Sequence, residues 1–198
     1  LDLYDQNEIT GHPDLSNVLD FMAEVQLQKN KSIALNYAKK ANESLSIYLR
    51  NSISNLNQRE ILELLLRLYS ERNPFDMLAI IEEPRSVFEA AVRYKGLILD
   101  YMTHKNQKKD ALSFLDLQCD DFRKTILPNQ VLLEYIKFDA FYNSSELESF
   151  YGVSLIFREN TNPSKLQYKW INLGPVAQID EAIDRIKSDS MVLIKKSD

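Results

Sequence analysis

The stretch WINLGPVAQIDEAIDRI, residues 170–186, contains the junction that decides the fold. Its first residues continue a strand-like run that begins at Tyr168, and Gly174 and Pro175 then lead into an amphipathic helix. We expect the apolar face of this helix to lie on a sheet. The apolar positions are Val176, Ile179, Ile183 and Ile186.

Three short runs rich in β-branched and aromatic residues predict the strands of that sheet. They are VLLEYIKF (131–138), YGVSLIF (151–157) and LQYKWINL (166–173). Short polar links join them, and sequential strands with short links favour an antiparallel meander. Because three strands and one helix form a thin layer, we expect more sheet from residues outside this sequence.

The residues before the strands predict helices. Residues 14–54 have the pattern of a helical hairpin, with Asn30 as the N-cap of its second helix. That second helix has a narrow stripe of small and apolar side chains, which allows another helix to approach closely. The stripe consists of Ala34, Ala38, Ala41, Leu45 and Tyr48.

Further helices are predicted up to Pro128. Asn57 and Glu60 have the spacing of a capping box, and a helix is expected after Pro84. One more helix is expected to place Cys119 on an apolar stripe that ends before Pro128. The predicted fold class is therefore α+β, with a helical part at 1–127 and a sheet part at 128–198.

Composition limits the class of partner. The 198 residues have a formal net charge of -5 and a pI near 5.2, whereas nucleic acids and anionic membranes require a basic face. The sequence has no apolar run long enough for a membrane helix. A single cysteine is typical of a reducing compartment, so we expect a cytoplasmic protein that contacts neither nucleic acid nor membrane.

The candidates for chemistry are few. Cys119 is expected to be a core residue, because it lies on the apolar stripe of its helix and burial makes a thiol inert. His12 and His104 are expected at helix ends as capping or solvated residues. Neither ligand spacing for a metal nor a glycine-rich phosphate loop occurs. We therefore predict no catalytic residue, no metal site and no cofactor.

Two groups of residues are candidates for binding a partner. Ala34 and Ala38 could line a peptide groove, and packing against the first helix of the hairpin is the alternative. Phe141 and Tyr142 lie in an aromatic segment around the polar loop NSSELES, where they could contact a protein or pack a hairpin end.

Residues 12–41, HPDLSNVLDFMAEVQLQKNKSIALNYAKKA, resemble one tetratricopeptide-repeat hairpin, in which Ala34, Ala38 and Ala41 match the small-residue positions. Later stretches resemble, in the same order, the region that leads into the CHAT domain of bacterial proteins that join such repeats to a caspase-like peptidase. These stretches are NLNQREILELLLRLYS (55–70), VFEAAVRYKGLILDYM (87–102), ILPNQVLLEYIKF (126–138) and YKWINLGPVAQIDEAIDRIK (168–187).

The resemblance implies a scaffold without catalytic residues. In that family the catalytic His and Cys follow the meander, and no position of this sequence matches their motifs. The sequence opens LDLYDQ without an initiator Met, which we interpret as a piece of a longer protein. The expected function is recognition of a protein or peptide partner, including the peptidase half of the parent cysteine peptidase. The alternatives are a free-standing helical adaptor and an enzyme that uses Cys119.

Overall fold

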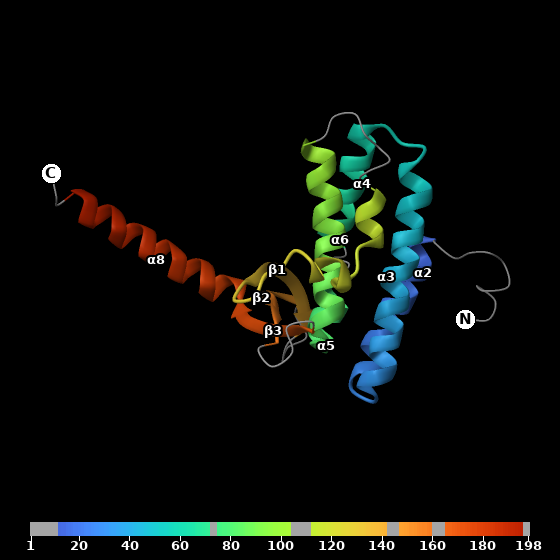
Figure 1. The fold of residues 1–198 in the computed structure, drawn as a ribbon, viewed down its shortest axis with the longest axis horizontal. Coiled ribbons are helices and arrows are strands. Elements are labelled where there is room, and N and C mark those ends of the chain that lie inside the picture. Colours follow the sequence, from blue (N-terminus) through green and yellow to red (C-terminus); the bar gives the residue numbers. More distant parts are fainter. Residues whose placement is uncertain (1–11, 72–74, 104–111, 142–146, 160–164, 196–198) are drawn as a thin grey trace.

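The computed structural model describes residues 12–71, 75–103, 112–141, 147–159 and 165–195 of the chain. The fold is α+β, as expected: helices precede a three-stranded antiparallel sheet, and one helix follows it (Figure 1). The elements are α2 (Pro13–Leu27), α3 (Lys31–Ile53), α4 (Gln58–Glu71), α5 (Asp76–Ile81), α6 (Pro84–Thr103), the 3₁₀ helices η1 (Leu112–Asp116) and η2 (Cys119–Arg123), β1 (Val131–Phe141), β2 (Leu147–Arg158), β3 (Leu166–Pro175) and α8 (Val176–Lys195).

Side-chain capping interactions start helices α3 and α4 at the predicted residues. The side chain of Asn30 accepts hydrogen bonds from the amides of Ser32 and Ile33, both at 3.1 Å, and so caps α3. At the start of α4, the Asn57 amide donates to Glu60 at 2.8 Å and the Glu60 amide donates to Asn57 at 3.1 Å. This reciprocal pair is the predicted capping box, which satisfies backbone donors that have no partner within the helix.

The helices and the sheet form layers, with α5 and α6 between them. One side of this middle layer contacts the sheet, while α2 and α3 meet α5 on the other side and α4 meets α6 (Figure 1). One hydrophobic cluster contains Ala34 of α3, Leu97 of α6 and Phe138 of β1. The change from helical to strand-like sequence near residue 128 is confirmed, but the residues on both sides of it share one core.

Aromatic side chains of the three strands pack on one another on one side of the sheet, in the same hydrophobic cluster as Leu97 of α6. Phe138 stacks on Phe150 of the neighbouring strand with a centroid distance of 5.6 Å, and the Trp170 ring meets Phe138 edge-on at 5.6 Å. Such pairs contribute about 0.5–1.5 kcal/mol each beyond their buried area. Gly152 lies under the indole of Trp170, so a Cβ at this position would overlap the ring. The side of the sheet that contains these residues is called its inner face.

The prediction of a single helix around Cys119 is wrong. The structure has two short 3₁₀ helices there, η1 and η2. The backbone groups between them bond to side chains of α6: Cys119 donates its amide to Glu89 at 2.9 Å, and the Leu117 carbonyl accepts from Arg93 at 2.6 Å. Tertiary hydrogen bonds therefore replace the bonds that a continuous α-helix would make.

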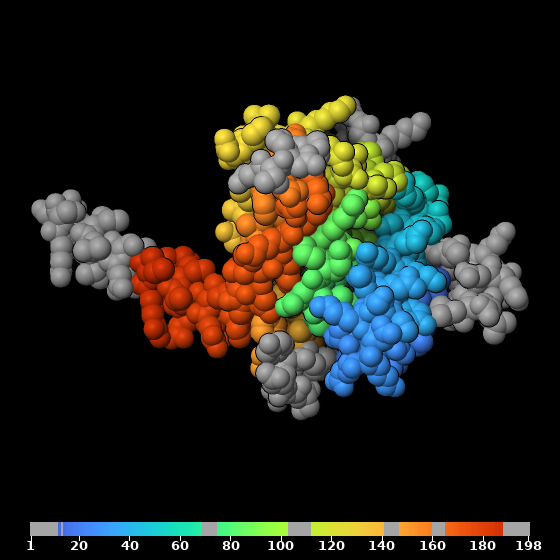
Figure 2. All heavy atoms as spheres, turned by 60° about the horizontal axis from the view of Figure 1, so that its bottom comes forward, coloured from blue at the N-terminus to red at the C-terminus, as the bar shows by residue number. Residues whose placement is uncertain are grey.

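The prediction that the last helix packs on the sheet is also wrong. Helix α8 contacts the sheet near its own start and then projects away from the body of the protein (Figures 1 and 2). Strand β3 ends at Pro175 and α8 begins at Val176, so no loop residue lets the helix reverse its direction. Connections that return a chain onto its sheet usually have about 2–6 residues.

The contact between Gly152 and Trp170 is testable. We expect Gly152→Ala to lower the free energy of unfolding by about 1–3 kcal/mol, because the added Cβ forces the indole out of its packed position. Urea denaturation measures the change. In a Trp170→Leu background the same substitution should have a much smaller effect, since the obstructing ring is gone. An equal loss in both backgrounds would contradict this account.

Candidate functional site

A groove between α3 and the first half of α6 is the candidate site. Its volume is about 470 Å³, and η1 forms one of its rims. The lining residues are Lys39, Asn42, Glu43, Ser46, Ile47 and Arg50 of α3, Leu78 of α5, Arg85, Ser86, Glu89, Ala90 and Arg93 of α6, and Leu115 and Asp116 of η1. A groove between packed helices is a common place for a ligand or peptide.

The wall contributed by α3 is polar for a simple reason. Lys39, Glu43, Ser46 and Arg50 recur every three or four residues, so they lie on one side of the helix, next to the alanine stripe. The sequence analysis used the alanine stripe and missed this neighbouring polar stripe. The spacing was visible in the sequence, but only the position of α6 shows that this side of α3 faces a groove.

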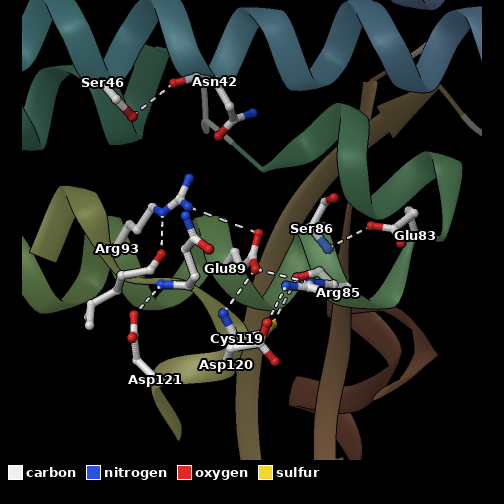
Figure 3. A network of polar contacts seen from close by, with 12 residues as sticks. Asn42, Ser46, Glu83, Arg85, Ser86, Glu89, Arg93, Cys119, Asp120 and Asp121 are labelled. Carbon is white, nitrogen blue, oxygen red and sulfur yellow. Dashed lines mark hydrogen bonds and ion pairs between the residues drawn. The ribbon is translucent and has the colours of Figure 1, made fainter. Parts of the chain in front are cut away.

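Glu89 is the centre of the polar network on the opposite wall (Figure 3). Its carboxylate accepts hydrogen bonds from the Arg85 guanidinium at 3.2 Å and from the Cys119 amide at 2.9 Å. The Arg93 guanidinium lies 4.0 Å from the second oxygen of Glu89. Arg85 also reaches Asp120 of η2, at 3.3 Å. The network therefore binds η2 and its neighbouring residues to α6.

The α3 side of the site has its own hydrogen bonds. Ser46 donates its hydroxyl proton to the Asn42 carbonyl at 2.9 Å, and the Tyr94 hydroxyl donates to the same carbonyl at 3.2 Å (Figure 3 shows the first). Burial raises the pKa of Tyr94 well above its usual value, so the phenol stays protonated and remains a donor. The Tyr94 bond therefore supports the contact between α3 and α6, while the Ser46 bond lies within α3.

Cys119 is a core residue, as the sequence predicted. Its side chain has no exposed surface, and its sulfur lies 3.6 Å from the Arg85 carbonyl. Burial and the nearby Glu89 carboxylate raise the pKa of the thiol far above its usual value. Because the thiolate is the nucleophile, this cysteine is unsuited to attack a substrate.

Of the two histidines, the structure describes His12, which is exposed at the start of α2, whereas Cys119 is buried. His12 caps α2, which is one of the two roles expected for it: its exposed ring accepts a hydrogen bond from the Asp14 amide at 3.2 Å. His104 lies outside the described residues. Within the described ranges, no group of three or more acidic, histidine or cysteine side chains has the arrangement of a metal site.

Of the predicted partner-binding residues, two are buried and the side chains of the other two are not described. Ala34 and Ala38 have no exposed surface, because this side of α3 packs in the hydrophobic core. They line no open groove, and packing is the role that the structure gives them. Phe141 is the last residue of β1, but its side chain and the whole of Tyr142 lie outside the described residues.

Comparison with known proteins gives no relative. The chain matches no protein-family model, no curated protein and no solved structure. In the described part of the chain, we find no helix with the length and apolar character of a membrane span. The candidate site therefore has to be interpreted from its own chemistry.

The wall of the groove combines charged and apolar side chains. Its wall pairs cations with carboxylates, as in Arg50 with Asp116 across the groove and Arg85 with Glu89. Apolar surface from Ile47, Ala90 and Leu115 lies between them. A mixed wall of this kind offers hydrogen-bond donors and acceptors to a polypeptide. A phosphate-rich ligand requires an excess of cations instead.

The state of Cys119 is testable with a thiol reagent such as Ellman's reagent. Since the sequence has one cysteine, complete labelling is one equivalent. We expect the folded protein to react slowly at neutral pH and the denatured protein to react promptly, because burial excludes the reagent and raises the pKa of the thiol. Prompt labelling of the folded protein would restore Cys119 as a candidate nucleophile.

The role of Arg93 is testable by a matched pair of substitutions. Arg93→Ala should lower the free energy of unfolding by about 1–3 kcal/mol, because the Leu117 carbonyl loses a charged donor. Arg59 also pairs with a glutamate one turn away, but its side chain is 88% exposed, compared with 22% for Arg93. Arg59→Ala should therefore leave the free energy of unfolding almost unchanged. Similar losses from both variants would contradict a linking role for Arg93.

Proposed function

We propose that this chain is a non-catalytic scaffold for protein–protein recognition and that the groove between α3 and α6 receives a peptide segment of the partner. The observation that carries the proposal is the groove itself. Its wall has donors, acceptors and apolar surface, while the one cysteine beside it is buried behind Glu89. The chain thus has the means to bind a polypeptide, and its cysteine is unsuited to cleave one.

The helical end of the molecule supports a scaffold role. Val18, Phe21 and Val25 are exposed on α2 and lie three and four residues apart, so they form an apolar stripe on one side of the helix. In stacked helical hairpins, such a face is buried by the next hairpin. The stripe agrees with the resemblance to tetratricopeptide repeats, and we propose that a further helical hairpin or a partner covers it.

The sheet supports the other half of the proposal. Two backbone groups at the outer edge of β1 already have partners: the Tyr135 carbonyl accepts from Lys95 of α6, and the Asp139 amide donates to Asp76 of α5 at 3.2 Å. Strand β3 is the opposite edge of the three strands that the structure describes. An additional strand therefore has better access to β3, where it can pair with the backbone of the edge strand and extend the sheet.

This edge is where we place the caspase-like half that the resemblance implies. In the parent protein a cysteine peptidase would then continue the sheet next to β3, and this chain would hold and orient it. The net charge of -5 and the single cysteine agree with a cytoplasmic protein that recognises other proteins and not nucleic acid. A free-standing adaptor is the alternative, and it requires the groove but no strand beside β3.

A peptide library displayed on phage tests the groove. We expect wild-type protein to select a set of peptides, and Glu43→Trp to weaken their binding at least about tenfold, because the indole fills the groove. The matched control is Lys40→Trp, which puts the same side chain on an exposed position of α3 that does not line the groove.

Two results would overturn this function. One is a set of selected peptides that bind Glu43→Trp as well as they bind the wild type, since the groove would then not be the site. The other is cleavage of the selected peptides by the wild type but not by Cys119→Ser. The second result would make the chain a peptidase in its own right.

A further inference from the structure

The sheet has an outer face that the helices leave open. Side chains alternate along a strand, so the residues between the buried inner positions of β1 point to the opposite side. Three of them are exposed: Val131 is 53% exposed, Leu133 46% and Tyr135 62%. The strand register places Phe157, Leu155 and Val153 of β2 next to them. The outer face is therefore apolar on β1 and β2, although Val153 itself is buried, and the register places Ile171, Lys169 and Gln167 of β3 beside them.

Helix α8 has an apolar side that is likewise exposed. Ile183 is 41% exposed and Ile186 is 65% exposed, and residues 181–187 are all exposed. The apolar residues recur every three or four positions, which is typical of a helix that packs on another surface. Figure 2 shows that α8 stands clear of the body beyond its first turns.

The dimensions of the two surfaces match. Three strands spaced about 4.8 Å apart make a face about 10 Å wide, which is the diameter of one helix with its side chains. The 20 residues of α8 span about 30 Å, comparable to the length of a strand of 11 residues such as β1. One helix is thus enough to cover the outer face.

The charges of the two surfaces are also complementary. Lys137 and Lys169 are exposed and lie on the outer face, one on each edge strand. Asp180 and Asp184 lie one turn apart beside the apolar side of α8, and Asp184 also pairs with Lys187 of the same helix at 3.5 Å. Asp180 already accepts a hydrogen bond from Tyr151 of the outer face at 3.3 Å, so the acidic side of the helix is compatible with this face.

We propose that a second copy of this chain occupies the outer face and that two copies exchange their α8 helices. In the structure the direct connection from β3 to α8 directs the helix away from its own sheet, so beyond its first turns α8 does not cover the outer face of its own chain. A two-fold axis satisfies both copies at once: each α8 covers the other copy's sheet. This dimer goes beyond the proposed function, because it uses neither the groove nor the β3 edge.

Light scattering coupled to size-exclusion chromatography tests the dimer on the complete chain. The expected mass is twice the 23.0 kDa of one chain. Ile183→Asp on the helix and Leu133→Asp on the sheet should each raise the dissociation constant at least about tenfold, since each would bury a carboxylate in an apolar contact. Both positions are exposed in one chain, so circular dichroism and thermal unfolding should show a normal fold; Tyr135→Asp replaces Leu133→Asp if that variant unfolds.

Mixing the two variants distinguishes an exchange from other dimers. A mixed dimer of Ile183→Asp and Leu133→Asp keeps one intact contact, between the unchanged helix of one copy and the unchanged sheet of the other. It should therefore form more tightly than either variant pairs with itself, which an affinity tag on one variant and native mass spectrometry can measure. Leu66→Asp, which changes an exposed apolar residue on α4, is the matched control and should leave the mass unchanged.

Three results would overturn the proposal. A monomeric wild type would leave the outer face to a partner of another kind. A dimer that neither substitution weakens would use a different surface. A mixture that fails to restore association would show that helix and sheet do not contact each other across the dimer. None of these results bears on peptide binding in the groove, so the two proposals can fail separately.

Discussion

The packing of the sheet on α6 is the constraint on which the rest of the structure depends. A three-stranded sheet requires an apolar cover to be stable in water, and α6 with α5 provides it on the inner face only. Within the sheet, Gly152 has no side chain and lets the Trp170 indole lie over the strand, against Phe138, and both rings belong to the same hydrophobic cluster as Leu97 of α6. The packing of the sheet on α6 joins the helical and sheet segments into one core.

Helix α6 also determines the environment of Cys119. Glu89 and Arg93 of this helix bind the backbone near η2, which places Cys119 in a small core with Phe88 and Ile156. Burial there suppresses ionisation of the thiol. The first half of α6 also contributes the second wall of the groove beside α3. One helix thus separates an inert interior from a surface that is suited to binding.

The open surfaces have a common origin. Each results from an element whose second apolar side has no cover among the described residues: the stripe on α2, the outer face of the sheet and the exposed side of α8. Soluble proteins rarely expose contiguous apolar surface without a partner. The three surfaces, together with the polar groove, are what we interpret as the scaffold character of the chain.

The sequence by itself determined what local interactions control. Asn30 caps α3, Asn57 and Glu60 form their capping box, and the three strands pair as a meander, because these features depend on residues close together in the chain. It also identified Cys119 as a buried residue from its place in an apolar pattern.

Only the tertiary structure decided how these elements meet. In place of the helix predicted around Cys119, the structure has η1 and η2, because side chains of α6 bond to the backbone there. The groove lies where the polar side of α3 faces α6. The apolar pattern of α8 showed that the helix needs a partner surface, but the missing loop after Pro175 directs it away from its own sheet. Periodicity specifies which side of an element is apolar, whereas the direction of the connecting chain decides what that side can reach.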